Sequence, residues 1–93
     1  MKVKELLSDE NKWTKGAMAR DIQGTACIYS SLFACCWCLH GAIDYCYPNK
    51  NERSSIFILV KRNLRGFRDI VSFNDNETIF FGDVKALVNE LDI

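Results

Sequence analysis

The segment that most constrains the fold is an apolar, sulfur-rich run in the middle of the chain, centred on residues 34–42. It holds three of the five cysteines, a tryptophan and the single histidine. Apolar positions recur there at steps of three and four, the spacing of one helix face: Ile28, Leu32, Cys35, Leu39, Ala42 and Cys46. A second sector with the same period contains Phe33, Trp37 and His40. The pattern predicts a helix over residues 28–45, apolar around most of its circumference and buried at the centre of the fold.

Shorter patterns predict the surrounding elements. Residues 1–7 predict a short helix, and residues 13–27, which contain Gly16 and Gly24, predict a small hairpin or an ordered loop. Residues 54–68 predict a second helix, residues 69–73 are short and β-prone, and a last helix runs from residue 82 or 83 to 91. We therefore expect a mainly α domain (α+β with a minor hairpin), with three or four helices around the buried central helix and residues 1–93 in a single domain.

Two features give these elements places to pack. Trp13 and Trp37 are large enough to anchor a core, and the Gly41-Ala42 pair allows another backbone segment to approach the central helix closely.

Charge is balanced overall but unevenly placed. The formal net charge is zero, which excludes both a polyanionic DNA mimic and a strongly basic DNA binder. Residues 50–68 carry six basic side chains against one acidic, whereas residues 69–93 carry six acidic against one basic. Either the two segments lie beside each other within the fold, or the basic segment forms an exposed strip that meets an acidic partner.

The chain has no early apolar run of the kind that opens a secretion signal, and no stretch of about 18 apolar residues. An odd number of clustered cysteines without such a signal is typical of reduced thiols. We expect a cytoplasmic protein that does not cross a membrane.

The cysteine cluster admits a metal, a catalytic and a packing interpretation. Cys35 and Cys38 have zinc-like spacing, but one continuous helix supplies at most two or three of four converging ligands. A nucleophilic thiol needs a base within reach, and His40 shares a helix face with Cys36 but not with Cys38. Free cysteine also packs as a small hydrophobe. We favour packing, and expect no metal, cofactor or catalytic residue.

Two polar pairs also have alternative interpretations. In the architectural one, Arg20 pairs with a carboxylate to hold the hairpin, and Asn74 or Asp75 caps the approach to the last helix. In the functional one, Arg20, Asp21, Asn74 and Asp75 form a small polar pocket with Arg20 as an anion-binding fork. We favour architecture.

The candidate partner-binding residues lie in the C-terminal half. Phe80 and Phe81 are adjacent in a polar stretch, so both cannot easily face one core, and an exposed apolar patch is the usual mark of a partner surface. Arg62, Arg65 and Arg68 add a basic face. No stacking or base-reading motif accompanies them, so nucleic acid is not the favoured partner.

Three motifs in one order carry a family resemblance. The matching positions fall in three groups: Trp13, Gly16, Ala17, Ala19, Arg20, Asp21 and Gly24; then Ala34, Cys36, Trp37, Cys38, Leu39, Gly41 and Ala42; then Phe73, Asn74 and Asp75, followed by Val84 and Leu87. With them the chain resembles a family of small bacterial and phage proteins catalogued as a domain of unknown function. This resemblance implies a small phage protein that acts on host machinery, which is an association and not a mechanism.

Three function classes remain open. The favoured one is a binding protein that occupies the surface of a host protein or protein complex, such as a phage-encoded inhibitor of a host defence or housekeeping protein, anti-CRISPR-like in kind. The second is a small-ligand or enzymatic domain that uses the Arg/Asn/Asp pocket with Cys38 nearby. The third is a nucleic-acid-binding accessory protein. A homodimer is compatible with any of them.

Overall fold

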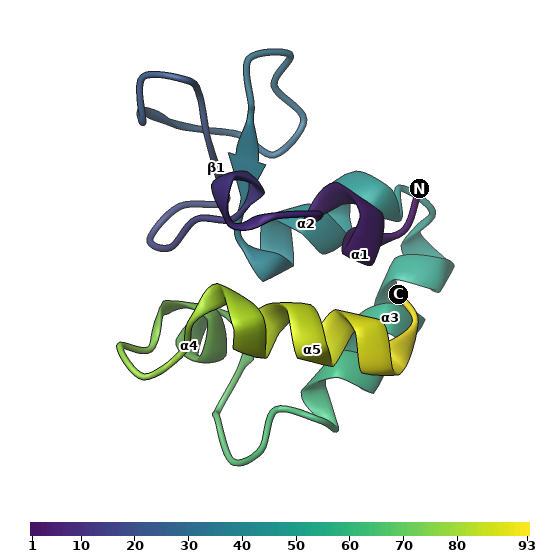
Figure 1. The fold of residues 1–93 in the computed structure, drawn as a ribbon. Coiled ribbons are helices and arrows are strands. Elements are labelled where there is room, and N and C mark those ends of the chain that lie inside the picture. Colours follow the sequence, from purple (N-terminus) through teal and green to yellow (C-terminus); the bar gives the residue numbers. More distant parts are fainter.

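In the computed structural model, which describes residues 1–93, the chain forms five α-helices, a 3₁₀-helix and three short strands (Figure 1). In chain order these are α1 (Val3–Leu6), the 3₁₀-helix η1 (Glu10–Lys12), β1 (Ala19–Arg20), β2 (Ala26–Cys27), β3 (Cys36–Trp37), α2 (Leu39–Cys46), α3 (Lys50–Lys61), α4 (Ile70–Asp75) and α5 (Phe81–Leu91). The fold is α+β, and it has more helices than the three or four that the sequence predicts.

The strands form one antiparallel sheet in the order β2–β1–β3. Ala19 lies opposite Cys27 on one side and Trp37 on the other, and Trp13 adds a parallel bridge to Trp37. Ala19 and Trp37 are buried, and the indole nitrogen of Trp37 donates to the carbonyl oxygen of Tyr29 at 2.9 Å. The hairpin predicted in residues 13–27 is present, and β3 extends it by a strand that the sequence pattern did not predict.

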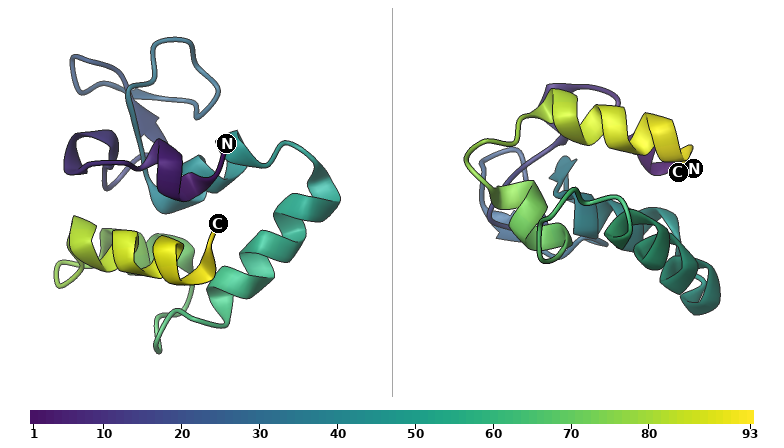
Figure 2. Two further views of the ribbon diagram at one scale, coloured as in Figure 1. Left: turned by 45° about the vertical axis from the view of Figure 1, so that its right-hand side comes forward. Right: turned by 90° about the horizontal axis from the view of Figure 1, so that it is seen from below.

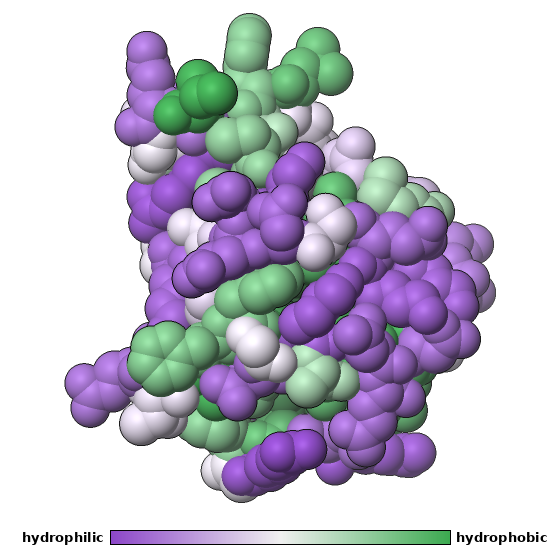
Figure 3. Space-filling view, viewed as in Figure 1, coloured by the Kyte–Doolittle hydropathy of each residue, from purple (hydrophilic) through white to green (hydrophobic).

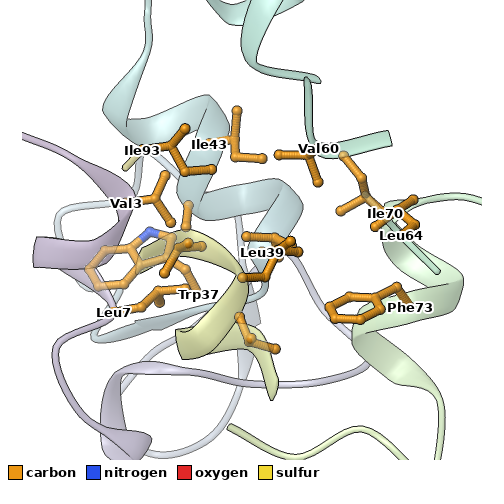
Figure 4. Packing of buried hydrophobic residues seen from close by; sticks show 14 of the residues in the cluster. Val3, Leu7, Trp37, Leu39, Ile43, Val60, Leu64, Ile70, Phe73 and Ile93 are labelled. Carbon is orange, nitrogen blue, oxygen red and sulfur yellow. The ribbon is translucent and has the colours of Figure 1, made fainter. Parts of the chain in front are cut away.

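The helices pack into the rest of the domain. α2 contacts α1, α3 and α4, and α1 also contacts α5. The chain termini lie close together (Figures 1 and 2), where Nζ of Lys2 and of Lys4 lie 2.9 and 2.5 Å from carboxylate oxygens of Asp92. The core between these elements contains 16 apolar residues, most of which are drawn in Figure 4. Those with no exposed surface are Val3, Leu7, Ala19, Leu39, Ala42, Ile43, Val60, Val84 and Val88. No helix is both long enough and apolar enough to cross a lipid bilayer.

The long central helix predicted for residues 28–45 is wrong. Helix α2 begins only at Leu39, and residues 28–38 form a loop and strand β3. The loop contains turns in which the amides of Ser31 and Ala34 donate to carbonyl oxygens three residues earlier, and the Ser31 hydroxyl accepts from the amide of Phe33. Serine side chains that bond the local backbone compete with helix formation. The apolar spacing was therefore real, but it did not mark a helix face.

Capping side chains set several boundaries that apolar spacing missed. Helix α3 begins at Lys50, not near residue 54, because Asn49 caps it by accepting from the amide of Glu52 at 3.0 Å. It ends before the left-handed Arg65 (φ 55°) and Gly66 (φ 92°), which cannot continue a helix.

Helix α4 replaces the short β-prone segment expected at residues 69–73. Asp69 caps it by accepting from the amide of Ser72 at 2.8 Å. A local cap thus outweighs the weak β-preference of Ile70 and Val71.

Candidate functional site

Arg20 is a structural clamp in the hairpin. Its Nε donates to the Thr14 hydroxyl, Nη1 to the carbonyl oxygen of Gly24 and Nη2 to that of Lys15, each at 3.0 Å. The carboxylate partner expected for Arg20 is wrong, because the guanidinium bonds carbonyl and hydroxyl oxygens and no ion pair forms. These bonds join the segment before β1 to the turn between β1 and β2, and they use all three guanidinium nitrogens.

Asp21 organises the turn that follows β1. Its Oδ1 accepts from the amides of Gln23 and Thr25, at 2.9 and 3.0 Å. Carboxylates that bond amides two to four residues on are typical of tight turns. Neither Arg20 nor Asp21 lines a pocket with Asn74.

Asn74, in α4, is the polar centre of the domain. Its side chain is only 1% exposed. The Oδ1 atom accepts from the indole nitrogen of Trp13 at 2.7 Å and from the amide of Leu39 at 2.9 Å. The Nδ2 atom donates to the carbonyl oxygen of Thr14 at 3.1 Å and to Oδ1 of Asp75 at 2.8 Å. Every donor and acceptor of the amide is used, so one side chain joins α4 to the start of α2 and to the chain before β1.

A pocket of about 180 Å³ lies beside this network. Its walls are Gly16, Ala17, Met18, Cys38, Val71, Asn74 and Asp75. Asp75 is held at the rim because its Oδ1 also accepts from the amide of Gly16 at 3.1 Å. The backbone of Met18 is so close to α2 that a Cβ on Gly41 would lie 2.1 Å from the Met18 carbonyl oxygen. The close backbone approach expected at Gly41 is therefore present. The polar pocket exists only in part, with Asn74 and Asp75 but without Arg20 and Asp21.

Cys38 caps α2, and its side chain is buried. Its Sγ accepts from the amide of Gly41 at 3.2 Å and lies 3.9 Å from Sδ of Met18. Burial raises the pKa of the Cys38 thiol, which favours the protonated, unreactive form.

His40 is not placed to activate this thiol. Its Nδ1 lies 3.1 Å from Oδ2 of Asp44, and its ring packs 4.8 Å from that of Phe57. With Phe57 and Lys61 it lines a separate depression of about 330 Å³. No thiol and base are brought together here.

The remaining cysteines do not assemble a metal centre. Sγ of Cys35 and of Cys36 lie 3.5 and 3.9 Å from the carbonyl oxygen of Arg20. Both side chains are half-buried, so the expected helical interior around them is not found. No three histidine, cysteine or acidic side chains are grouped so that they would hold a metal ion.

The two adjacent phenylalanines separate. Phe81 is half-buried, with its ring 6.2 Å from that of Trp13, while Phe80 is 69% exposed. Nζ of Lys15 lies 5.5 Å from the centre of the Trp13 ring and 5.9 Å from that of the Phe80 ring. Phe80 therefore remains the exposed aromatic group at the start of α5.

The three arginines are all exposed after α3. Arg65 lies 3.9 Å from a carboxylate oxygen of Glu90, and Arg68 lies 3.1 Å from one of Asp69. A small hollow of about 90 Å³ separates this loop from α5; Asn63, Arg65, Phe67, Phe73, Ile79, Asp83, Ala86 and Leu87 line it. The basic and acidic segments thus lie side by side, and Arg65 borders a hollow with a mostly apolar lining.

A model of one protein family matches residues 1–91. The chain belongs to DUF6197, a family of unknown function. This confirms the resemblance to a family without an assigned function. No curated protein and no solved structure matches the chain.

Sequence reasoning missed the most apolar exposed surface of this DUF6197 protein. Four large side chains stand on the loops that join β1 to β2 and β2 to β3, and we call them the apolar tip: Ile22 (91% exposed), Ile28 (67%), Leu32 (99%) and Phe33 (78%). In Figure 3 hydrophobic side chains gather at the upper end of the molecule, where Figure 1 draws these loops. The turn-forming Ser30-Ser31 and Gly24 were the available signals.

Proposed function

We propose that this protein acts by binding the surface of another protein and not by catalysis. The polar groups that would serve chemistry are already engaged, since Arg20, Asn74 and Cys38 all bond other parts of the chain. The most concrete form of the proposal is a phage-encoded inhibitor of a host defence or housekeeping protein.

The observation that carries the proposal is the face around the hollow between the α3–α4 loop and α5. The lining of the hollow is mostly apolar and includes Phe67 and Leu87, and Arg65 also lines it. Phe80 stands next to it in the chain, and its amide donates to Asp83, another lining residue, at 2.8 Å. Interfaces between proteins commonly combine an apolar centre with a charged rim and are enriched in aromatic residues and arginine.

The rim indicates a partner with carboxylates. Arg65 and Arg68 are within reach of Glu90 and Asp69, but exposed ion pairs contribute only about 0–1 kcal/mol and exchange easily. A partner carboxylate that is partly desolvated on contact would compete well for a planar guanidinium. A partner apolar side chain would fill the hollow.

The test uses the full chain immobilised through a tag and exposed to an extract of host cells. Combined Arg65→Glu and Phe80→Ala changes should remove the partner that the unchanged protein retains, and weaken binding of that purified partner at least tenfold. Lys12→Glu and Ile58→Ala, at exposed positions elsewhere, are the matched controls. Equal retention of the same proteins by both variants would reject this surface.

The pocket beside Asn74 favours a second candidate, a site for a small apolar ligand with a cationic or hydrogen-bond-donating end. Its walls are mostly apolar, and Asp75 supplies one carboxylate at the rim. A thermal-shift screen of small amines against the protein and its Asp75→Asn variant tests this. A stabilisation that depends on Asp75 would favour the ligand site over the protein surface.

A further inference from the structure

We propose that the apolar tip is a self-association surface, through which two copies of this chain pair about a two-fold axis. The tip comprises Ile22, Ile28, Leu32 and Phe33, on two loops that leave the same small sheet. This proposal is independent of the function proposed above, because the arginines and Phe80 belong to other elements.

The loops of the tip are held in place within the single chain. The Asp21 carboxylate fixes the first loop through the amides of Gln23 and Thr25. The second is fixed where the Trp37 indole donates to the carbonyl oxygen of Tyr29. Apolar side chains on preorganised loops lose little further conformational entropy on binding. The same loops leave these side chains in water, which is unfavourable unless a second surface covers them.

The lack of charge at the tip fits a second copy as the occupant. Residues 22–43 contain no aspartate, glutamate, lysine or arginine. A two-fold axis sets each patch against its own copy, so a patch of one sign would repel itself, whereas an uncharged patch does not. The tip therefore carries no charge that would oppose pairing with its own copy, and none that would select an acidic or a basic partner.

The exposed apolar area of the tip is of the size expected for a weak, reversible dimer. At roughly 100 Å² of apolar surface for each side chain, the tip offers about 400 Å² per copy, which is in the range of the largest functional patches on single chains. Two copies would bury about 800 Å² from these side chains alone. Flanking residues such as Tyr29 and Thr25 would bring the total to about 1,000 Å², the lower end for specific interfaces. We therefore expect a dimer that forms and dissociates with concentration.

Sedimentation velocity of the reduced full-length protein between about 5 and 500 µM tests the proposal. The unchanged protein should shift from monomer to dimer over this range. The Leu32→Ser/Phe33→Ser variant should raise the dissociation constant at least tenfold. An Ile58→Ser/Val71→Ser variant removes two half-exposed apolar side chains elsewhere and should dimerise normally. A monomer at every concentration, or a dimer that the tip variant does not weaken, would overturn the proposal.

Two further measurements identify the occupant. Hydrogen exchange of residues 21–34 should slow as concentration rises, while exchange in the α3–α4 loop stays constant. Flotation with phosphatidylcholine vesicles should leave the protein unbound. Tip-dependent binding of a monomer to these vesicles, or exchange in residues 21–34 that does not change with concentration, would overturn the self-association surface.

Discussion

The side chain on which the fold most depends is Asn74, and its replacement by alanine should be the most damaging single polar change in the chain. The change removes four hydrogen bonds, to Trp13, Leu39, Thr14 and Asp75. A buried group left without a partner costs about 1–3 kcal/mol. The amide of Leu39 lies deepest, whereas the half-buried indole of Trp13 and carbonyl of Thr14 regain some water.

Together these losses amount to about 4 kcal/mol. A domain of this length has a total stability of about 5–14 kcal/mol, so the variant would lose a large fraction of it. The melting temperature should fall by about 15–30 °C. Urea denaturation followed by circular dichroism measures the change, and tryptophan fluorescence of a Trp37→Phe background reports on Trp13. Asn89→Ala, at an exposed position on α5, is the matched control and should stay within about 0.5 kcal/mol of the unchanged protein.

An Asn74→Asp variant separates the loss of bonds from the loss of volume. It keeps an acceptor for Trp13 and Leu39 but places a buried carboxylate against that of Asp75. Burial and the negative charge of Asp75 both favour the protonated form of the introduced carboxyl group. This variant should therefore be unstable at neutral pH and regain stability as the pH is lowered, while Asn74→Ala should show no such recovery. A loss below about 1 kcal/mol for Asn74→Ala would refute the central role of the network.

Three further changes test the packing and the charges. Gly41→Ala would place a Cβ 2.1 Å from a backbone oxygen of Met18 and should destabilise the fold by at least about 2 kcal/mol in urea titrations. The control, Gly82→Ala, has open space around its new Cβ and should be neutral or stabilising by up to about 1 kcal/mol. Hydrogen bonds from Lys4 and Lys2 lower the pKa of Asp92 to about 2, so its contribution to stability is present above pH 4 and is lost as the pH falls towards 2. In acid denaturation, the Asp92→Asn variant should therefore not show this loss of stability between pH 4 and pH 2. Burial raises the pKa of the Cys46 thiol to about 11, so mass spectrometry should find it alkylated more slowly at pH 8 than the same cysteine in the urea-unfolded chain. The difference should close only as the pH rises past about 11.

The sequence predicted elements best where local signals agreed. The last helix was found because Val84, Leu87 and Leu91 follow a helical period. The hairpin was found because Gly16 and Gly24 indicate turns, and Gly24 lies in the turn between β1 and β2. The prediction for the central segment failed because its apolar residues have helical spacing without lying on a helix. Some of them, such as Leu39 and Ala42, enter the core, while others, such as Leu32, project from a loop. Periodicity counts apolar positions but cannot tell which side of the backbone is solvated.

Candidate site residues were likewise predicted well only where a local sequence signal was present. Asn74 has an architectural role, but the cap expected from Asn74 or Asp75 at the approach to the last helix is wrong, because that helix begins at Phe81 with Phe80 and Asp83 at its cap. The partners of Asn74 lie as far as 61 residues away in the chain and leave no local pattern. The separation of Phe80 from Phe81 required only that adjacent residues face different ways. The apolar tip was missed because exposure of large hydrophobic side chains runs against the usual expectation of burial.

The exposed tip should contribute little to the stability of the single chain, and this separates its role from that of the core. Leu32 is 99% exposed, so replacing it by serine removes almost no buried apolar area from the monomer. At low protein concentration the free energy of unfolding of Leu32→Ser should stay within about 0.5 kcal/mol of the unchanged protein. At high concentration the unchanged protein should gain stability over the variant, because association that involves only the folded state raises its apparent stability. A loss above about 1 kcal/mol in the dilute variant would mean that Leu32 is packed within the single chain.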